Sequence, residues 1–172
     1  MEKKIWNTRD KLSPHFSYDE MTRSQTAERN SIDNTPSGEQ VDNLIELCDN
    51  ILEPVRVYFN RPITVTSGFR CRELNRKIGS TDRSQHTKGE AADFVVNGSP
   101  TVTIVWRWII DSDLDFDQVI QEFGRWVHIS FKKNGNNRHK CSIAKKVNGR
   151  TRYFHYNEEQ IASGEYESVT KV

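Results

Sequence analysis

The chain has 172 residues, a formal net charge of +1 and a hydrophobic fraction of 34%. This length fits one domain, residues 1–172, and we expect its core to span about residues 12–156, ahead of a polar tail. The near-neutral charge and the lack of a basic stripe argue against nucleic-acid binding. No run of 18 apolar residues is present, so we expect no membrane insertion. Composition leaves the oligomeric state open.

Two features indicate the compartment in which the chain is made. Residues 1–7 carry basic side chains without the apolar segment and cleavage site of a secretory signal, which predicts synthesis in a cytoplasm. The three cysteines are widely spaced and form no CxxC pair, so they do not suggest a disulfide framework. We expect buried or half-buried free thiols at Cys48, Cys71 and Cys141.

The first long predicted element is a helix. Residues 1–36 before it are polar and are expected to be irregular. Ser37 and Gln40 have the spacing of a capping box, which satisfies two backbone N–H groups at a helix start. Apolar residues then recur at helical spacing as far as Val55, which predicts a helix with one buried face. Pro54 is expected to end or kink this helix, because proline lacks the N–H that a helix needs.

The rest of the chain predicts strands joined by hairpins, with two further helices among them. A helix is expected over residues 72–78, and another begins with Ser99 as its N-cap and Pro100 at its first helical position. The tail from Glu158 is expected to be frayed. This mixture predicts the α+β class, as a small domain of mixed helices and antiparallel sheet. The predicted strands are residues 63–66, 91–96, 118–123, 126–131, 141–147 and 152–156.

His86 and Asp93 stand out because of their surroundings. His86 lies in the polar loop of residues 80–89, whereas Asp93 lies within the apolar strand of residues 91–96. A buried carboxylate is costly without a partner, and a cation is one solution. Gly89 and the small residues after it allow the chain to fold tightly between the two groups. A salt-bridged aspartate beside a loop histidine is the alternative to a metal site.

His128 is the third candidate ligand. Side chains alternate between the two faces of a strand, so His128 shares a face with Trp126 and Ser130, while the apolar residues between them face the core. A histidine that is satisfied within the strand is the alternative. Together His86, Asp93 and His128 offer three protein ligands and leave a fourth position open for water, which is the arrangement of a catalytic zinc site. The predicted cofactor is therefore Zn²⁺.

Two further side chains are candidates for catalysis. Glu122 lies six residues before His128, and a hairpin at Gly124 is expected to bring its carboxylate back over the metal as a general base. Arg70 follows a predicted strand, where its guanidinium can hold a carboxylate or stabilise an oxyanion. A surface glutamate and a solvated arginine are the alternatives. The remaining histidines are expected to be surface or locally hydrogen-bonded residues: His15, His139 and His155.

Several segments resemble the D-Ala-D-Ala carboxypeptidase family of zinc peptidases. The most specific is Ser84-x-His86-x-x-Gly89-x-Ala91-x-Asp93, which matches the SxHxxGxAxD motif of that family. Weaker matches are the third-ligand segment, the segment with a substrate-facing arginine, and an N-terminal part typical of the phage and prophage branch: Trp126 to His128, Ser67 to Arg70, and residues 12–36. The resemblance covers about residues 12–131.

The resemblance implies the fold that these peptidases share with the hedgehog signalling domain, a bound zinc ion, and a peptidoglycan stem peptide as substrate and partner. It implies that the zinc ligands are His86, Asp93 and His128. Substrate contacts are expected from the polar and aromatic side chains around the site: Arg70, Ser84, Trp126 and Ser130.

One departure from the family pattern concerns the base. Some members place the glutamate three residues before the last histidine, and others carry a second histidine two residues before it. In this chain those positions are Arg125 and Trp126. The longer spacing of Glu122 resembles the hedgehog-type arrangement, which keeps a non-catalytic function open.

Two functions therefore fit the sequence. The first is a zinc-dependent peptidase that hydrolyses peptidoglycan stem peptides with activated water, as a D-Ala-D-Ala carboxypeptidase or as an L-Ala–D-Glu-type endopeptidase. The alternative is a hedgehog-like binding module that keeps zinc for structure and recognises a wall component or a partner protein. An enzyme made in the cytoplasm is expected to reach the wall by holin-type release or as a virion component, unless it serves in cytoplasmic recycling.

Overall fold

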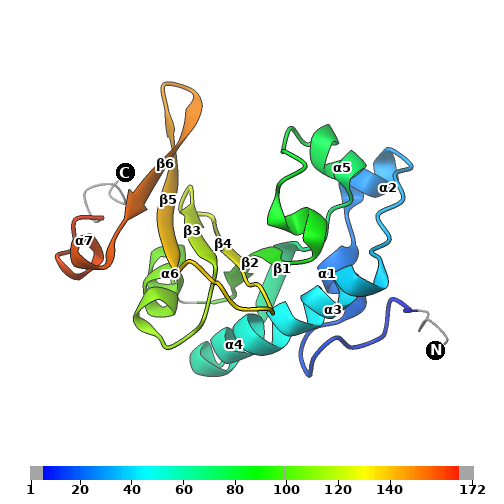
Figure 1. Ribbon diagram of the computed structural model, residues 1–172, viewed down its shortest axis with the longest axis horizontal. Helices are drawn as coiled ribbons and strands as arrows, with labels where there is room; N and C mark the ends of the chain where they lie inside the picture. Colours follow the sequence, from blue (N-terminus) through cyan, green and yellow to red (C-terminus); the bar gives the residue numbers. More distant parts are fainter. Residues whose placement is uncertain (1–5, 99, 167–172) are drawn as a thin grey trace.

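The computed structural model describes residues 6–98 and 100–166 of the chain. Its centre is a six-stranded sheet in the order β1-β2-β4-β3-β5-β6 (Figure 1). Neighbouring strands are antiparallel except β3 and β5, which run parallel. The predicted α+β class with a largely antiparallel sheet is confirmed. The strands are β1 (Ile63–Ser67), β2 (Ala91–Val96), β3 (Gln118–Glu122), β4 (Trp126–Ser130), β5 (Lys140–Val147) and β6 (Arg150–Tyr156).

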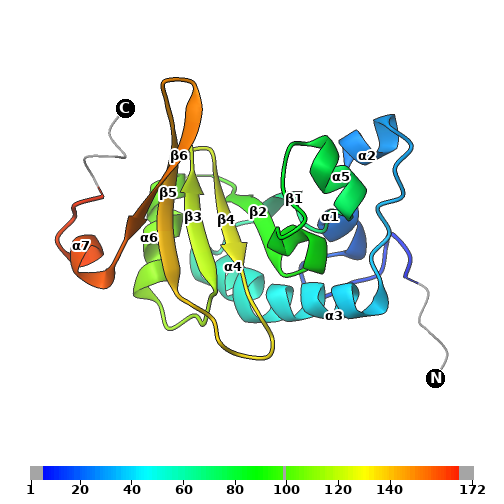
Figure 2. The same cartoon turned by 45° about the horizontal axis from the view of Figure 1, so that its top comes forward.

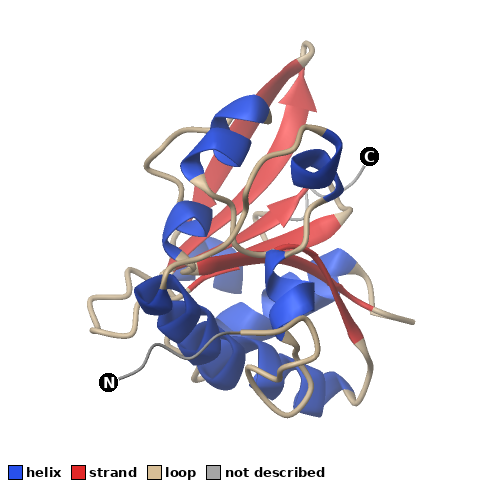
Figure 3. Cartoon of the chain, turned by 90° about the vertical axis from the view of Figure 1, so that its right-hand side faces the viewer, coloured by secondary structure: helices blue, strands red, loops and turns tan. Residues whose placement is uncertain are grey.

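Helices pack on the sheet and beside its β1 edge. The helical segments are α1 (Tyr18–Thr22), α2 (Gln25–Arg29), α3 (Gly38–Leu47), η1 (Cys48–Leu52), α4 (Glu53–Phe59), α5 (Arg72–Lys77), η2 (Gln85–Lys88), α6 (Val102–Asp111) and α7 (Glu158–Ala162). Helix α6 lies against β2, β3 and β4, and the buried residues of α3 and α4 belong to the same core. Figure 3 shows helices packed against the sheet. In residues 6–98 and 100–166, no helix has the length and apolar character that crossing a membrane requires.

The strands divide their side chains between two faces. Val127 and Ile129 of β4 are 1% and 0% exposed and lie on the face covered by α6, with Phe94 of β2 beside them. His128, between them in sequence, projects from the other face and is paired with Asp93. The predicted division of this strand is confirmed. Burial of each large apolar side chain contributes about 1.5–3 kcal/mol, so one face stabilises the fold and the other is free for polar residues.

The helix predicted from Ser37 begins as expected and runs further than expected. The Ser37 hydroxyl accepts a hydrogen bond from the Gln40 N–H at 3.4 Å, and the Gln40 side chain accepts one from the Ser37 N–H at 2.7 Å. The prediction that Pro54 ends or kinks the helix is wrong about the end, because the chain stays helical to Phe59. The turn before the proline widens into the π-helical segment η1, which accommodates a residue that has no N–H to donate.

The expectation that residues 1–36 are irregular is wrong for two short segments. Ser17 and Ser24 act as N-caps for α1 and α2, and their side chains accept hydrogen bonds from backbone N–H groups. Each helix buries one apolar residue, Met21 at 0% exposure and Ala27 at 3%. Helices of five residues are too short for a periodic pattern, so caps and a single buried residue stabilise them.

The start of α6 also differs from the prediction. Thr101 is the N-cap, because its side chain accepts a hydrogen bond from the Ile104 N–H at 3.3 Å. Pro100 therefore precedes the helix and is not its first residue. Ser99, the expected N-cap, lies outside the described residues. The error arises because two hydroxyl residues flank the proline and both fit a helix start.

The C-terminal segment is more ordered than predicted as far as Tyr166, and residues 167–172 of the predicted tail lie outside the described residues. The expected terminal hairpin is confirmed as β5 and β6. The tail from Glu158 was expected to be frayed, but residues 158–162 form α7. Asn157 and Gln160 form a capping box, and Ile161 is 3% exposed within the core. One buried residue and one cap again stabilise a short helix.

The segment η2 lies tightly against α3. The Gln40 side chain donates to the Thr87 carbonyl at 2.9 Å, and Asn43 donates to the Lys88 carbonyl at 2.9 Å. Gly89 ends η2 with φ +73°, and a Cβ atom at this position would lie 2.3 Å from the Gln40 carbonyl oxygen. Helix and loop therefore touch backbone to backbone, which fixes the position of η2 over the sheet.

Gly89→Ala is expected to destabilise the protein by more than about 3 kcal/mol, because alanine must bear both left-handed strain and a backbone clash. Gly79→Ala is the matched control, since Gly79 has φ +80° and nothing within 4 Å of an added Cβ. The control should cost about 1–2 kcal/mol, from strain alone. Urea-induced unfolding measures both values, and equal losses in the two variants would contradict the close approach.

Asp117, just before β3, is a buried carboxylate that pairs with two cations. Its side chain is 0% exposed, and it lies 2.6 Å from Lys132 Nζ and 2.5 Å from Arg138 Nη2. Burial raises the pKa of Asp117, but the hydrogen bonds from Arg138 and Lys132 outweigh burial and lower the pKa to about 2. This cluster ties the segment after β4 to the start of β3.

The ionised form of Asp117 is expected to stabilise the fold in a defined pH window. Because its folded pKa of about 2 is below the ordinary 3.8, its contribution is present above pH 3.8 and is lost as the pH falls through about 2. Asp117→Asn should remove roughly 2 kcal/mol of pH dependence from the free energy of unfolding in this window. Urea unfolding at several pH values measures it. Exposed Asp113 provides the control, and an unchanged profile in Asp117→Asn would argue against the cluster.

Candidate metal centre

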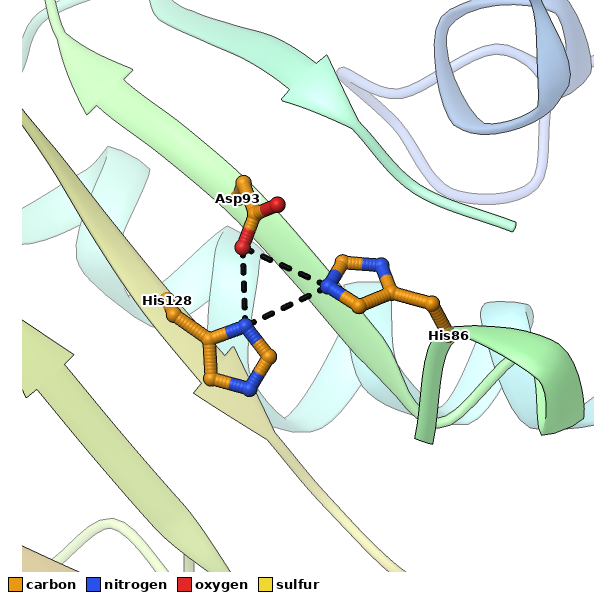
Figure 4. A group of neighbouring side chains, drawn as sticks. All are labelled: His86, Asp93 and His128. Atoms are coloured by element: carbon orange, nitrogen blue, oxygen red, sulfur yellow. Dashed lines mark hydrogen bonds and ion pairs between the residues drawn. The ribbon is translucent and has the colours of Figure 1, made fainter. Parts of the chain in front are cut away.

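Three side chains from different elements meet on the face of the sheet opposite α6 (Figure 4). Asp93 comes from β2 and His128 from β4, and the two residues are paired across these neighbouring strands. Paired residues project from the same face, so the register alone brings both side chains together. His86 is brought over the strands by η2. The structure therefore assembles all three ligands that the sequence predicts.

The ligand atoms have the spacing of a tetrahedral site. Asp93 Oδ1 lies 2.8 Å from His128 Nδ1 and 3.3 Å from His86 Nε2, and the two histidine nitrogens are 3.2 Å apart. Atoms bound to zinc at about 2.0–2.1 Å in tetrahedral geometry are roughly 3.3 Å apart. Nitrogen and carboxylate donors are also the types that zinc binds. The three residues therefore fit a zinc ion with little movement.

A backbone hydrogen bond fixes the ring of His86. Its Nδ1 lies 2.6 Å from the carbonyl oxygen of Gly68, and because a carbonyl only accepts, Nδ1 carries the proton. The Nε2 lone pair is then directed at Asp93 and His128. Burial lowers the pKa of His86, which keeps the ring neutral at pH 7. A neutral ring held by an outer hydrogen bond is the form that binds a metal.

Asp93 carries the negative charge at the centre of the site. Burial raises its pKa, but the interactions with His86 and His128 outweigh burial and hold the pKa well below its usual range. The carboxylate is therefore ionised at neutral pH. This carboxylate is the only acidic group of the ligand set, which leaves a bound divalent cation incompletely neutralised.

Arg70 contacts the second oxygen of Asp93. Its Nη1 donates to Asp93 Oδ2 at 3.4 Å and to Ser67 Oγ at 2.8 Å, and its Nε donates to Asn75 Oδ1 at 3.1 Å. Arg70 therefore orients a metal ligand, a role that the sequence did not suggest. Asn75 is 0% exposed and supports the guanidinium from α5. An asparagine in a polar helix gives no sequence signal of such a role.

Glu122 lies on the same face as the ligands. β3 and β4 pair Glu122 with Trp126, two residues along from His128, so the hairpin returns the carboxylate to this face. Burial raises the pKa of Glu122, and the charge of Asp93 raises it further, while positive groups nearby act in the opposite direction. Glu122 is thus a carboxylate with a raised pKa beside the ligand set, not within it.

The other predicted substrate contacts differ in their access to the surface. Ser84 and Trp126 are half-buried. The Trp126 indole N–H lies close enough to Glu122 to favour the charged carboxylate, but it makes no hydrogen bond of normal geometry with a described residue. Ser130 is 0% exposed, and within the described chain its hydroxyl has no hydrogen-bond partner. A substrate could touch Ser130 only if the residues that bury it moved. Ser84 and Trp126 are more accessible to a substrate, because both are partly exposed.

The remaining histidines and the cysteines lie where the sequence predicts. The three histidines form local pairs at 2.7–3.0 Å: His15–Glu53, His139–Asp115 and His155–Ser142. All three cysteines are free, with Cys48 and Cys141 buried and Cys71 half-buried. Burial raises the pKa of the Cys141 thiol to about 11, so it is not a thiolate at neutral pH.

His86→Ala is expected to lose stoichiometric zinc. Mutation of a residue that only hydrogen-bonds a metal ligand lowers metal affinity by about 10–100-fold. Loss of a ligand itself should therefore weaken zinc binding by more than roughly 100-fold. Atomic emission after dialysis measures the zinc content of each variant. His139→Ala, at a histidine that pairs with Asp115, should keep the zinc content of the wild type. Full zinc retention in His86→Ala would contradict the ligand assignment.

Comparison with known families places this site in context. A sequence model of the family described as peptidase M15 matches residues 14–130, which is more than half of the chain. The matched segment contains the three ligands, Arg70 and Glu122, and it ends before β5. No curated protein matches the chain. The match and the geometry of the ligands agree, and the chain belongs to the peptidase M15 family of zinc metallopeptidases.

Proposed function

We propose that this protein hydrolyses the stem peptides of bacterial peptidoglycan. The observation that supports the proposal most is the position of Glu122 beside a three-ligand metal site on one face of the sheet. A structural zinc site closes with four protein ligands, whereas a catalytic site keeps one position open. Within the described residues, the cluster of His86, Asp93 and His128 has no fourth ligand.

The ligand set suits hydrolysis of a peptide bond. His86, Asp93 and His128 would hold the zinc ion. When bound, zinc lowers the pKa of a coordinated water towards neutrality and polarises a carbonyl group. The single negative charge of the ligands leaves a net positive site, which favours a substrate with a carboxylate near the cleaved bond.

Glu122 is the proposed general base and general acid. Its carboxylate accepts a proton from the attacking water and returns that proton to the amine that leaves. The raised pKa of Glu122 supports both steps, because proton exchange is most efficient when the pKa approaches the working pH. The neighbouring Trp126 N–H stands beside the carboxylate and favours its charged form, the form that accepts the proton in the first step.

Arg70 is proposed to bind the substrate as well as to orient Asp93. Its Nε and Nη1 are engaged, whereas its Nη2 makes no hydrogen bond to another residue of the described chain. The side chain is 14% exposed. The free N–H groups can donate to a carboxylate of the stem peptide or to the oxyanion that develops during attack. Ser84 and Trp126 are proposed as further contacts on the same face.

The wall substrate is supported by the SxHxxGxAxD motif between Ser84 and Asp93 and by the resemblance of residues 12–36 to the phage and prophage branch. Two bonds fit this proposal: the terminal D-Ala-D-Ala bond of a carboxypeptidase and the L-Ala–D-Glu bond of an endopeptidase. We also propose that the protein, made in the cytoplasm, reaches the wall by holin-type release or as a virion component.

Incubation of zinc-loaded protein with purified peptidoglycan, followed by mass spectrometry, tests the proposal and identifies the bond that is cut. Glu122→Gln is expected to keep its zinc and to lower kcat by about 10²–10⁴-fold, because proton transfer is lost. Glu159→Gln, at an exposed position on α7, is the matched control and should cleave like the wild type.

A different result would support the alternative function. If the wild type binds zinc and releases no fragment, the protein is better described as a hedgehog-like binding module with a structural metal. Equal cleavage by the wild type and Glu122→Gln would keep the peptidase but would remove Glu122 from its mechanism.

A further inference from the structure

The β5-β6 hairpin extends the ligand-bearing face beyond the segment that defines the family. The family match ends at residue 130, and both strands follow it. β5 pairs in parallel with β3, and β6 pairs with β5, so the hairpin continues the sheet from the strand that carries Glu122. Figure 2 shows the turn of the hairpin projecting past the ends of the neighbouring strands.

One row of residues connects this hairpin to the site. Glu122 is in register with Ala144 of β5, and Ala144 is in register with Tyr153 of β6. Trp126 occupies the same row on the other side of Glu122. Paired residues project from one face, so Tyr153 shares the face of Glu122 and the ligands. Ala144 is 0% exposed and places only a methyl group between Glu122 and Tyr153.

The Tyr153 side chain is free to meet a ligand. It is 50% exposed, and its hydroxyl makes no hydrogen bond to another residue in the described part of the chain. Partial burial raises the pKa of this phenol, and the charges of Glu122 and Asp93 raise it further. The hydroxyl therefore lies within the electrostatic reach of the site and stays protonated as a hydrogen-bond donor.

The sheet sets the distance between Tyr153 and the ligands. Neighbouring strands lie about 4.8 Å apart, so β6 is roughly 14 Å from β4 across β3 and β5. A tyrosine side chain that extends over Ala144 covers part of this distance. The rest corresponds to roughly two residues of extended peptide at about 3.3 Å each. Arg70 stands on the β1 side of the ligands, so a peptide that reaches from Arg70 to Tyr153 is longer than a dipeptide.

We propose that Tyr153 is a specificity-determining residue that binds the substrate about two residues from the cleaved bond. Its hydroxyl donates to a peptide carbonyl or carboxylate, and its ring packs on the peptide chain. This subsite selects extended stem peptides over dipeptides. The inference rests on the proposed peptidase function for its substrate class.

Kinetics on peptides of different length test the subsite. Tyr153→Phe is expected to raise KM for the whole stem peptide by about tenfold, the loss of one hydrogen bond, with kcat within about twofold. On the dipeptides L-Ala–D-Glu and D-Ala-D-Ala, the variant should match the wild type. Phe154→Leu is the control, because Phe154 lies next to Tyr153 on the same hairpin and faces the opposite side of the sheet. Zinc content and melting temperature should be unchanged in both variants.

Calorimetric binding gives a readout that does not need turnover. In a zinc-loaded Glu122→Gln background, Tyr153→Phe should weaken binding of the stem peptide by about tenfold and leave dipeptide binding unchanged. No effect, or an equal effect at all lengths, would overturn the subsite. Binding that depends on Tyr153 without any turnover by the wild type would overturn the peptidase function and support the subsite. Failure of every peptide to bind would overturn both.

Discussion

The buried carboxylate of Asp93 is the constraint on which the rest of the site depends. An ionised carboxylate in a protein interior is strongly disfavoured unless its oxygens are satisfied, and this side chain is only 14% exposed. One oxygen faces His86 and His128, and the other faces Arg70. Two of these partners are tied to each other, since His86 bonds to the Gly68 carbonyl and the Arg70 N–H donates to the His86 carbonyl at 3.2 Å. The need to satisfy one charge thus couples η2 to the turn after β1.

That coupling explains why helices outside the sheet matter for the metal site. A Cβ atom at Gly68 would lie 2.3 Å from the Met21 carbonyl oxygen, and the Phe69 N–H donates to the same oxygen at 2.7 Å. Helix α1 therefore holds the turn that holds His86. On the other side, α3 holds η2 through the close approach at Gly89. His86 is thus fixed by a second layer of backbone contacts, and Asp93 and His128 are fixed by the pairing of β2 with β4, which together give the preorganisation that a metal site requires.

The sequence was most informative where one local pattern allows one structure. Alternation in the strand that carries His128 assigned this residue to the polar face, because a strand has no other period. Features that depend on distant partners were not predictable: the parallel pairing of β3 with β5, and the bond from Arg70 to Asp93. The widened turn before Pro54 also escaped prediction, since packing of the helix onto the core can offset a proline that local propensity disfavours.

The sheet also separates the residues that hold the metal from those that face the far end of a substrate. The ligands come from η2, β2 and β4, and none comes from β5 or β6. The hairpin is joined to the site by main-chain pairing with β3, so its register depends on backbone hydrogen bonds and not on the identity of Tyr153. A side chain at that position can therefore change in size or polarity without disturbing Asp93. Metal binding and the proposed choice of substrate thus rest on different strands of one sheet, and Glu122 lies on the strand between them without being a metal ligand.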